Sequence, residues 1–240
     1  MIEKKVFEAI NFRRSVRIFK KTEINKEKVK QCIQNGTLAP NSSNLQLWEF
    51  IHVTNKEIQK KITKACLNQN AAKTANQLVI IVVRKDLWRQ RAKENANFLK
   101  EQSKEGLMSD KSFKMALNYY TKLIPFTYTD FFGVFGVLKS FTAQITGLFR
   151  PMYRQLSSSD KRIISHKSAA LAAQNFMISM SAIGYDTCPM EGFDSLMVKK
   201  ILKIPSKAEI NMIIGCGIRD KKGIYGKRYR VPFENVYKAI

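Results

Sequence analysis

The chain has 240 residues, of which 45% are apolar, enough to fill a substantial core. Its 42 lysines and arginines outnumber 19 acidic residues, and the formal net charge of +23 gives the surface a strong attraction for anions. The basic residues occur singly or in pairs and form no tail, which argues against a nucleic-acid groove and favours a solvated lysine-rich surface.

The cysteines and the apolar runs indicate where the protein resides. The four cysteines are far apart and form no Cys-x-x-Cys pair, so we expect neither a disulfide framework nor a zinc knuckle. The most apolar region, Leu123 to Phe149, is interrupted by Asp130 and Lys139, and it lacks the uncharged run of about 20 residues that a spanning helix needs. With no apolar leader at the N-terminus, these features predict a cytoplasmic protein without a membrane partner.

In chain order, the first feature is a short amphipathic helix with apolar residues from Ile2 to Ile10 at helical spacing. It places the cluster Arg13-Arg14-Ser15-Val16-Arg17 in the loop that follows. Three guanidiniums and a hydroxyl within five residues suit phosphate or carboxylate oxygens. The alternative is a basic turn that merely faces water.

The next segment alternates helices and strands. Asn25 is placed to cap a helix, Pro40 ends it, and the polar turn 41–44 leads into a strand over Trp48–Val53. Asn55 is placed to cap a third helix, which ends near Asn68.

The middle of the chain changes character twice. Residues 78–83 form an uninterrupted apolar run, typical of a strand buried on both faces at the centre of a sheet. Residues 84–122 have a mostly helical pattern. The segment from Pro125 to Pro151 is rich in phenylalanine and glycine and has no clean period. It is either an aromatic flap over a pocket or a set of rings that fill the core, and the second interpretation is favoured.

The last part of the chain contains three further elements. A long helix from Ser165 to Ile183 presents small residues that form a candidate dimer seam, and Gly184 ends it. Residues 188–194 form a tight turn, in which Gly192 permits close approach of a ligand. A strand over Glu209–Gly217 follows.

Beyond that strand the chain is polar and basic. Arg228 and Arg230 lie two residues apart and on one side of an extended chain. They are placed to meet Arg13 and Arg14 on one phosphate.

Several chemistries are excluded. His52 and His166 are isolated, so a histidine-centred metal site or a Ser-His-Asp relay has little to build from. There is no Gly-x-Ser-x-Gly motif and no Walker loop, and the acidic residues are too dispersed to nominate a carboxylate pair. No repeat or linker divides the chain, so we expect one domain over residues 1–240.

Four motifs in order, 13–17, 39–48, 189–194 and 228–232, resemble the FMN-dependent nitroreductase family. The resemblance covers about residues 10–83 and 165–236, with a helical and aromatic segment at about 85–164 that matches poorly. It implies an α+β fold with a central, mostly antiparallel sheet surrounded by helices. It also implies a homodimer that holds FMN at the subunit interface.

The resemblance assigns roles to particular residues. Five would surround the phosphate and ribityl chain: Arg13, Arg14, Ser15, Arg228 and Arg230. Arg17 would stabilise negative charge at the pyrimidine edge of the flavin. The partner subunit would contribute Pro40, Asn41, Ser42 and Asn44. The turn against the other face would consist of Pro189, Met190, Glu191 and Gly192, with the Glu191 backbone N–H directed at flavin N5. Asn68 would bond the ring edge.

The chain also departs from the family pattern. Leu47 stands where proline is usual, Asn41 stands where serine is common, and Ala71 falls near a position often taken by lysine or glutamine. The last difference removes one expected contact to the ring edge.

The resulting hypothesis is an oxidoreductase that takes hydride from NADH or NADPH and reduces a nitroaromatic, a quinone or a similar electron-poor acceptor by a ping-pong mechanism. The cofactor would carry the chemistry, which explains the scarcity of catalytic side chains. Two alternatives stay open. One is a protein that binds or processes flavin without turnover, and the other, less favoured, is a basic nucleic-acid-binding protein.

Overall fold

The centre of the molecule is a four-stranded antiparallel sheet. The structure is a computed structural model that describes residues 3–129 and 134–240. Its strands are β1 (Trp48–Val53), β2 (Gln77–Val83), β3 (Asp186–Met190) and β4 (Glu209–Gly217), in the order β1-β2-β4-β3. The predicted bounds of β1 and β4 are confirmed, and β2 begins one residue earlier than expected. Every residue of β2 is buried and the strand is internal, as its apolar run predicts.

The strand β3 corrects one expectation. Residues 188–190 were expected in a tight turn, but they complete a strand that pairs with β4 from Asp186↔Gly217 to Met190↔Ile213. Pro189 is tolerated because β3 is an edge strand of the sheet. The turn itself is shorter and occupies 191–194, ahead of α10 (Ser195–Leu202).

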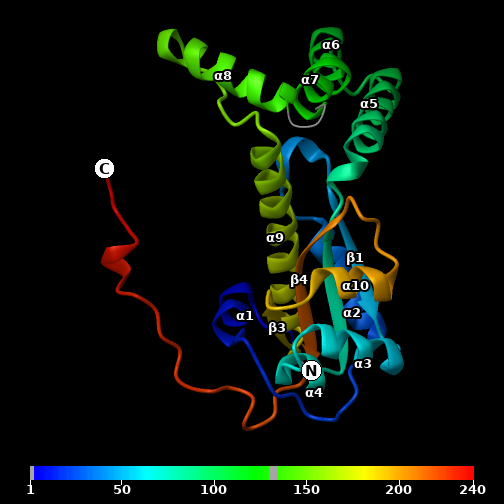
Figure 1. Cartoon of the computed structure of the whole chain (residues 1–240), viewed down its shortest axis with the longest axis vertical. Coiled ribbons are helices and arrows are strands. Elements are labelled where there is room, and N and C mark those ends of the chain that lie inside the picture. The colour runs from blue at the N-terminus through cyan, green and yellow to red at the C-terminus, as the bar shows by residue number, and fades with distance from the viewer. Residues whose placement is uncertain (1–2, 130–133) are drawn as a thin grey trace.

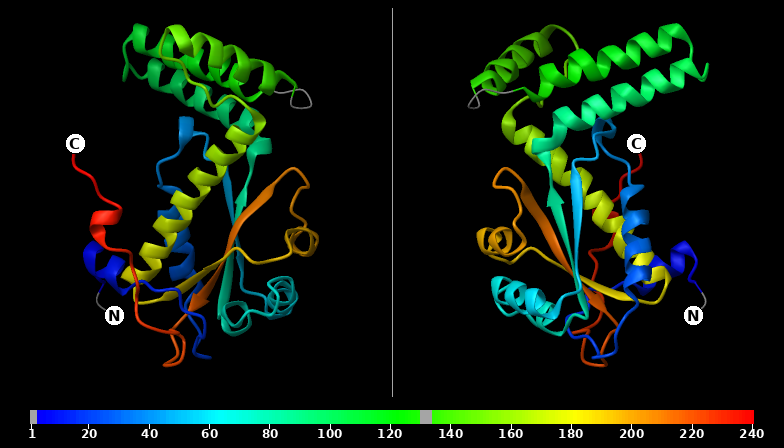
Figure 2. Two further views of the ribbon diagram at one scale, coloured as in Figure 1. Left: turned by 60° about the vertical axis from the view of Figure 1, so that its left-hand side comes forward. Right: turned by 90° about the vertical axis from the view of Figure 1, so that its right-hand side faces the viewer.

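Helices cover both faces of the sheet (Figures 1 and 2). On one face lie α2 (Lys26–Thr37) and α9 (Ser158–Ala182), and on the other lie α3 (Lys56–Ala65) and α10. The caps predicted for α2 and α3 are confirmed, because the side chains of Asn25 and Asn55 each accept two backbone N–H groups. The short helices α1 (Val6–Phe12) and α4 (Asn70–Thr74) lie at one end of the sheet. The predicted α+β class, with an antiparallel sheet between helices, is therefore confirmed.

Two expectations for the longest helix are wrong. It begins at Ser158 rather than near Ser165, because Ser157 and Asp160 form a capping box about two turns upstream. Its small residues do not form an open dimer seam: Ala169, Ala172 and Phe176 are 0% exposed because α2 and the sheet of the same chain cover them.

A helical extension stands at the far end of the sheet (Figure 1). It consists of α5 (Trp88–Lys104), α6 (Asp110–Asn118), α7 (Ile124–Tyr128) and α8 (Val134–Phe149), with a π-helical turn over Tyr119–Leu123. Single 3₁₀ turns occur at Ser42–Asn44, Lys85–Leu87 and Phe233–Asn235. The helical prediction for 84–122 is confirmed.

The core-filling interpretation of the aromatic segment is wrong for the phenylalanines that the structure describes. Phe126, Phe141 and Phe149 are 56%, 63% and 84% exposed, and Phe135 is exposed as well. Phe131 and Phe132 lie outside the described residues. In the described ranges, no helix is both long enough and apolar enough to cross a membrane.

Candidate functional site

The arginine cluster lies where the chain leaves α1 and runs beside β3. The Val16 N–H donates to the Thr187 carbonyl at 3.1 Å, and Ser15 forms an isolated parallel bridge with Thr187. Val16 is fully buried. Because side chains alternate along an extended chain, the burial of Val16 turns Ser15 and Arg17 to the opposite side. The segment is therefore a fifth, short element of the sheet edge, and it presents Ser15 and Arg17 outward.

The C-terminal tail returns to this cluster from more than two hundred residues away. Nη2 of Arg228 donates to the carbonyl oxygens of Asn11 and Arg13, both at 2.7 Å. Nη2 of Arg14 donates to the Gly226 carbonyl at 2.8 Å. Part of the donor capacity of Arg228 and Arg14 therefore holds the tail against the end of α1 rather than facing a ligand.

The electrostatics of the cluster are unfavourable in the free chain. Burial lowers the pKa of Arg13, and the positive charges of Arg228, Arg230 and Arg14 lower it further. Among the described residues, no carboxylate forms an ion pair with any of these four arginines or with Arg17. A group of guanidiniums without a counter-ion is stabilised by an anion with several acceptor oxygens.

A buried ion pair between Asp186 and Arg219, which the sequence analysis missed, holds the end of α1 against β3 next to the arginine cluster. Asp186 is 3% exposed, and its carboxylate accepts hydrogen bonds from Nε, Nη2 and the backbone N–H of Arg219. The same Nη2 donates to the Phe12 carbonyl at 3.1 Å, and the guanidinium lies 3.9 Å from the centre of the Phe12 ring. Arg219 thus joins β3 to the end of α1. The only sequence signal was an aspartate at the start of a short segment that is mostly apolar.

The turn after β3 forms a second wall of the site. Met190 is buried, whereas Glu191 and Gly192 are exposed. Nε2 of Gln69 donates to the Gly192 carbonyl at 2.6 Å, which ties this turn to the start of α4. The Glu191 N–H has no acceptor among the described residues and is free to bind a ligand.

Two polar contacts connect this turn to the arginines. Nδ2 of Asn70 donates to the Tyr225 hydroxyl at 3.1 Å, and the Arg17 guanidinium lies 5.3 Å from the centre of the Tyr225 ring. Asn68 is exposed beside them in a left-handed conformation, with φ of 54°. Ala71, where a ring-edge contact was expected to be missing, is buried, and the neighbouring Gln69 amide bonds the Gly192 carbonyl.

Cys188 lies among the arginines but is not a nucleophile. The thiol is 4% exposed. Burial raises its pKa even though the charges of Arg17 and Arg13 act in the opposite direction. The thiol is therefore neutral, and the site has no activated sulfur.

The segment 40–44 is not part of this cluster within one chain. The Ser42 N–H donates to Oγ of Ser168, near the middle of α9, whereas Oγ of Ser181 near the end of α9 donates to Ala9 in α1. The two serines are thirteen positions apart, which corresponds to about 20 Å of helix. Pro40 and Ser42 are exposed, while Asn44 pairs with Asn95 of α5 at 3.0 Å and Asn41 accepts the Gln46 N–H.

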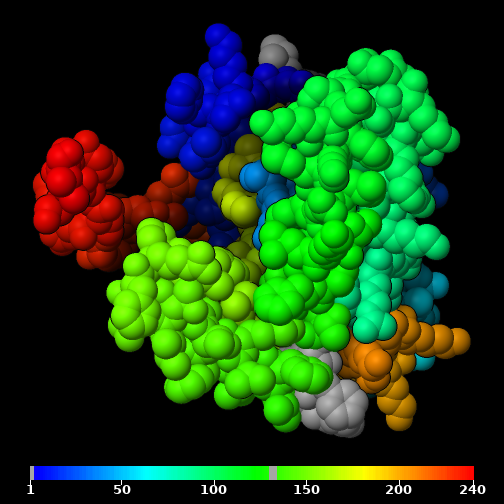
Figure 3. All heavy atoms as spheres, turned by 90° about the horizontal axis from the view of Figure 1, so that it is seen from above, coloured from blue at the N-terminus to red at the C-terminus, as the bar shows by residue number. Residues whose placement is uncertain are grey.

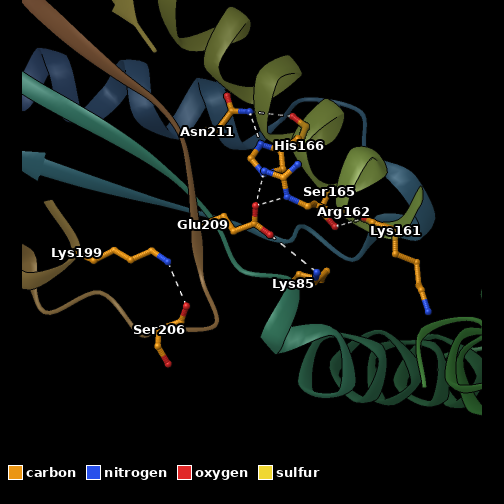
Figure 4. A network of polar contacts seen from close by, with 9 residues as sticks. All are labelled: Lys85, Lys161, Arg162, Ser165, His166, Lys199, Ser206, Glu209 and Asn211. Carbon is orange, nitrogen blue, oxygen red and sulfur yellow. Dashed lines mark hydrogen bonds and ion pairs between the residues drawn. The ribbon is translucent and has the colours of Figure 1, made fainter. Parts of the chain in front are cut away.

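A second polar network is structural. Figure 4 shows Glu209 between His166 and Arg162, with Lys85 3.9 Å away. Burial tends to raise the pKa of Glu209, but hydrogen bonds from His166 and Arg162 lower it overall. Both ring nitrogens of His166 are used, by Glu209 and Asn211, and His52 bonds Gln77 at 2.7 Å. Neither histidine is placed for catalysis, in keeping with the sequence analysis.

The fold and the site define a class: α+β proteins that gather guanidiniums from two distant segments at the end of an antiparallel sheet. The chain belongs to the Nitroreductase family, whose model matches residues 10–218. The predicted nitroreductase-like fold is thereby confirmed.

Individual relatives agree with this assignment. Protein DrgA of Synechocystis is 25% identical over 227 residues, which cover 94% of this chain and 90% of DrgA. The crystal structure of YdfN from Bacillus subtilis superposes with a TM-score of 0.75 at 22% identity and covers 98% of both chains. The NADPH:FMN oxidoreductase of Vibrio harveyi, solved with NAD⁺, gives a TM-score of 0.62 at 16% identity and covers 98% of this chain and 76% of that one.

Proposed function

We propose that this protein is an FMN-dependent oxidoreductase that takes hydride from NADH or NADPH and passes reducing equivalents to an electron-poor acceptor. The observation that carries the proposal is the uncompensated arginine cluster beside a turn with a free amide. Membership of the Nitroreductase family, and the names of relatives such as the Vibrio NADPH:FMN oxidoreductase, support it.

The residues present fit FMN. A phosphate supplies the negative charge that the Arg13 cluster lacks, and it would relieve the repulsion that lowers the pKa of Arg13. Arg13, Arg14 and Arg230 would bind the phosphate, with Ser15 as a hydroxyl donor. Arg228 would hold the tail in place through its bonds to Asn11 and Arg13.

The ring would lie toward the turn after β3. Arg17 would place a fixed positive charge at the pyrimidine edge, and the Glu191 N–H would orient the reactive nitrogen. Asn68 and the Gln69 amide would bond the ring edge. When bound, FMN supplies the hydride chemistry, so the residues of this chain contribute binding, orientation and charge.

The second half of the site would come from another copy of the chain. Within one chain, the 40–44 segment bonds α9 at Ser168 and α1 bonds it at Ser181, and these two residues are about 20 Å apart along the helix. A homodimer, the commonest oligomer, allows Pro40, Asn41, Ser42 and Asn44 of each copy to face the arginines of the other. Exposed Ser42 is available for this contact.

An apolar cavity beside this segment provides a place for the acceptor. Its volume is about 340 Å³, and its lining includes Ser42 and Ser43 together with Tyr119, Phe126 and Tyr153. Aromatic walls suit a flat ring such as a quinone or a nitroaromatic compound. Since donor and acceptor would use the same exposed ring face in turn, we expect ping-pong kinetics.

The direct test is spectroscopic. Protein loaded with FMN and mixed with NADH or NADPH under nitrogen should lose its visible absorbance, and an added quinone should restore it. Steady consumption of the reductant distinguishes turnover from storage of flavin. A spectrum unchanged by either reductant would refute the proposal.

A mixing experiment tests the shared site. Arg13→Met damages one half of the site and Ser42→Trp the other, so each homodimer should bind FMN poorly. A heterodimer of the two variants has one intact site, so refolding an equal mixture should recover about a quarter of the wild-type sites. No recovery would show that both halves belong to one chain or that no dimer forms.

A further inference from the structure

The Arg17 side chain lies against an aromatic ring. Its guanidinium is 5.3 Å from the centre of the Tyr225 ring, within the range of a cation–π contact. Among residues 3–129 and 134–240, this guanidinium makes no hydrogen bond. The guanidiniums of Arg14 and Arg228 are instead fixed by backbone carbonyls. The position of the Arg17 charge therefore depends on Tyr225.

Tyr225 is itself fixed from two sides. Nδ2 of Asn70 donates to its hydroxyl at 3.1 Å, which ties the ring to the start of α4. On the other side, the Gly223 carbonyl accepts the Arg17 N–H at 2.8 Å, and a Cβ at Gly223 would collide with the Ile18 carbonyl oxygen. The loop that carries Tyr225 is therefore packed tightly against the arginine segment, and the ring has a defined place although it is 60% exposed.

An aromatic support suits this arginine better than a carboxylate would. A carboxylate would neutralise the guanidinium and occupy its N–H donors, whereas a cation–π contact leaves the positive charge uncancelled. Tyr225 also lies beyond residue 218, where the match to the family model ends. The contact is therefore a feature of this chain outside the matched segment.

We propose that Tyr225 is a positioning residue that holds the Arg17 guanidinium at the pyrimidine edge of FMN and thereby raises the reduction potential of the bound flavin. The inference rests on the proposed function, which places Arg17 at that edge. Reduced flavin carries negative charge there, so a fixed guanidinium stabilises the reduced form more than the neutral oxidised form. A guanidinium that moves freely in water gives less of this stabilisation.

The size of the effect follows from the strength of the contact. A cation–π contact at an exposed site changes an equilibrium about two- to fivefold. Without the ring, reduced FMN should therefore bind more weakly by this factor, relative to oxidised FMN. Since a tenfold change corresponds to about 30 mV for a two-electron couple, the reduction potential should fall by about 10–20 mV.

Substitutions of Tyr225 separate the ring from its hydroxyl. Tyr225→Leu removes the ring and should lower the potential of the FMN-loaded protein, measured by equilibration with a redox dye. Tyr225→Phe keeps the ring and loses only the bond to Asn70, so its potential should be closer to that of wild type than to that of Tyr225→Leu.

The C-terminal tail offers a matched control. Tyr237 is 57% exposed and stacks on Phe233 within the tail. Figure 3 shows the last residues of the chain, in red, apart from the body of the molecule. Tyr237→Leu makes the same chemical change as Tyr225→Leu and should leave the potential unchanged.

A double variant shows whether Tyr225 acts through Arg17. In Arg17→Met, the addition of Tyr225→Leu should lower the potential no further, because no guanidinium is left to position. An equal fall in both backgrounds would mean that the ring contacts the flavin itself, and it would overturn the positioning role.

The contact can also be measured without FMN. In the free protein, the ring current of Tyr225 should shift the Nε–H nuclear magnetic resonance of Arg17, which is identified by its absence from Arg17→Met. Tyr225→Leu should remove this shift, whereas Tyr237→Leu should preserve it.

Two further results would overturn the proposal and leave the proposed function intact. One is an Arg17 resonance that Tyr225→Leu does not move. The other is a wild-type potential in Tyr225→Leu loaded with FMN that NADH or NADPH still reduces. Wild-type protein whose flavin neither reductant reduces would instead refute the proposed function, and this inference with it.

Discussion

Replacement of Arg13 by methionine should have opposite effects on the free and the FMN-loaded protein. Methionine keeps an apolar stem of similar length and removes the charge together with the hydrogen-bond donors. In the free protein, burial and the charges of Arg228, Arg230 and Arg14 already disfavour the guanidinium, as the lowered pKa of Arg13 shows. Arg13→Met should therefore raise the melting temperature of the free protein, by an amount equivalent to less than about 1 kcal/mol for so accessible a group.

The loaded protein should respond in the other direction. A hydrogen bond to a charged group contributes about 1.5–3 kcal/mol, so loss of the Arg13 contact should raise the FMN dissociation constant about 10- to 150-fold. With FMN at 100 times the wild-type dissociation constant, ligand stabilisation is about 2.7 kcal/mol, and a 30-fold weaker variant retains about 0.9 kcal/mol. For a chain of this size, that difference lowers the melting temperature by about 4–7 °C.

Isothermal titration and thermal melts at one protein concentration measure both effects. Arg89→Met, which removes the same charge from α5 at the other end of the molecule, should leave FMN affinity unchanged. Arg13→Lys should give an intermediate affinity, because it keeps the charge and loses the planar fork. An FMN dissociation constant in Arg13→Met within twofold of wild type would refute this reasoning.

Three further predictions concern the supports of the site. Arg219→Met leaves the Asp186 carboxylate buried and unpaired, and it should lower the free energy of unfolding by about 3 kcal/mol in denaturant titrations, whereas Lys221→Met should have no effect. Burial raises the pKa of Cys66 to about 11 and of Cys32 to about 12, so a thiol reagent at pH 8 should modify none of the four cysteines before unfolding. Because unfolded thiols ionise first, stability should also fall as the pH rises above about 9. Glu209 has a lowered pKa in the folded state. Its contribution to stability is therefore present above the pKa of an unfolded glutamate and is lost as the pH falls through the folded pKa. Glu209→Gln should make the free energy of unfolding less dependent on pH in this acidic range.

The sequence predicted the elements whose signals are local. Asn25 and Asn55 are caps because an asparagine side chain bonds the first turn of its own helix, and β2 is central because its run is apolar on both faces. The start of α9 was placed near Ser165, whereas Ser157 and Asp160, three residues later, form the capping box that begins the helix about two turns earlier. The small residues of α9 were assigned to a dimer seam because a helix pattern does not say which neighbour covers it, and α2 does so here.

The candidate site, too, was predictable where its residues are neighbours in the sequence and not where they are distant. The anion site was predicted because its arginines are close together in the sequence. The Asp186–Arg219 ion pair and the Gln69–Gly192 hydrogen bond each join residues that are far apart in the sequence and belong to no common motif. These contacts are therefore seen only in the folded chain. The exposed face of α8 was missed for a related reason. The segment is rich in phenylalanine without a clean period, and whether those side chains are buried depends on what the rest of the chain places against them.

Removal of the C-terminal tail should affect FMN binding without affecting the fold. Residues 227–240 are all exposed and lie beyond the residues matched by the family model, so a chain ending at Gly226 loses no buried contact. It should keep its helical and strand content, and it should bind FMN at least tenfold more weakly, because Arg228 and Arg230 are absent. Arg228→Met with Arg230→Met in the full chain should weaken FMN binding to a similar extent. If the truncated chain binds poorly but the double variant binds as wild type, the tail acts through the second subunit rather than through its guanidiniums. The roles given to Arg228 in holding the tail and to Arg230 in binding the phosphate would then be wrong.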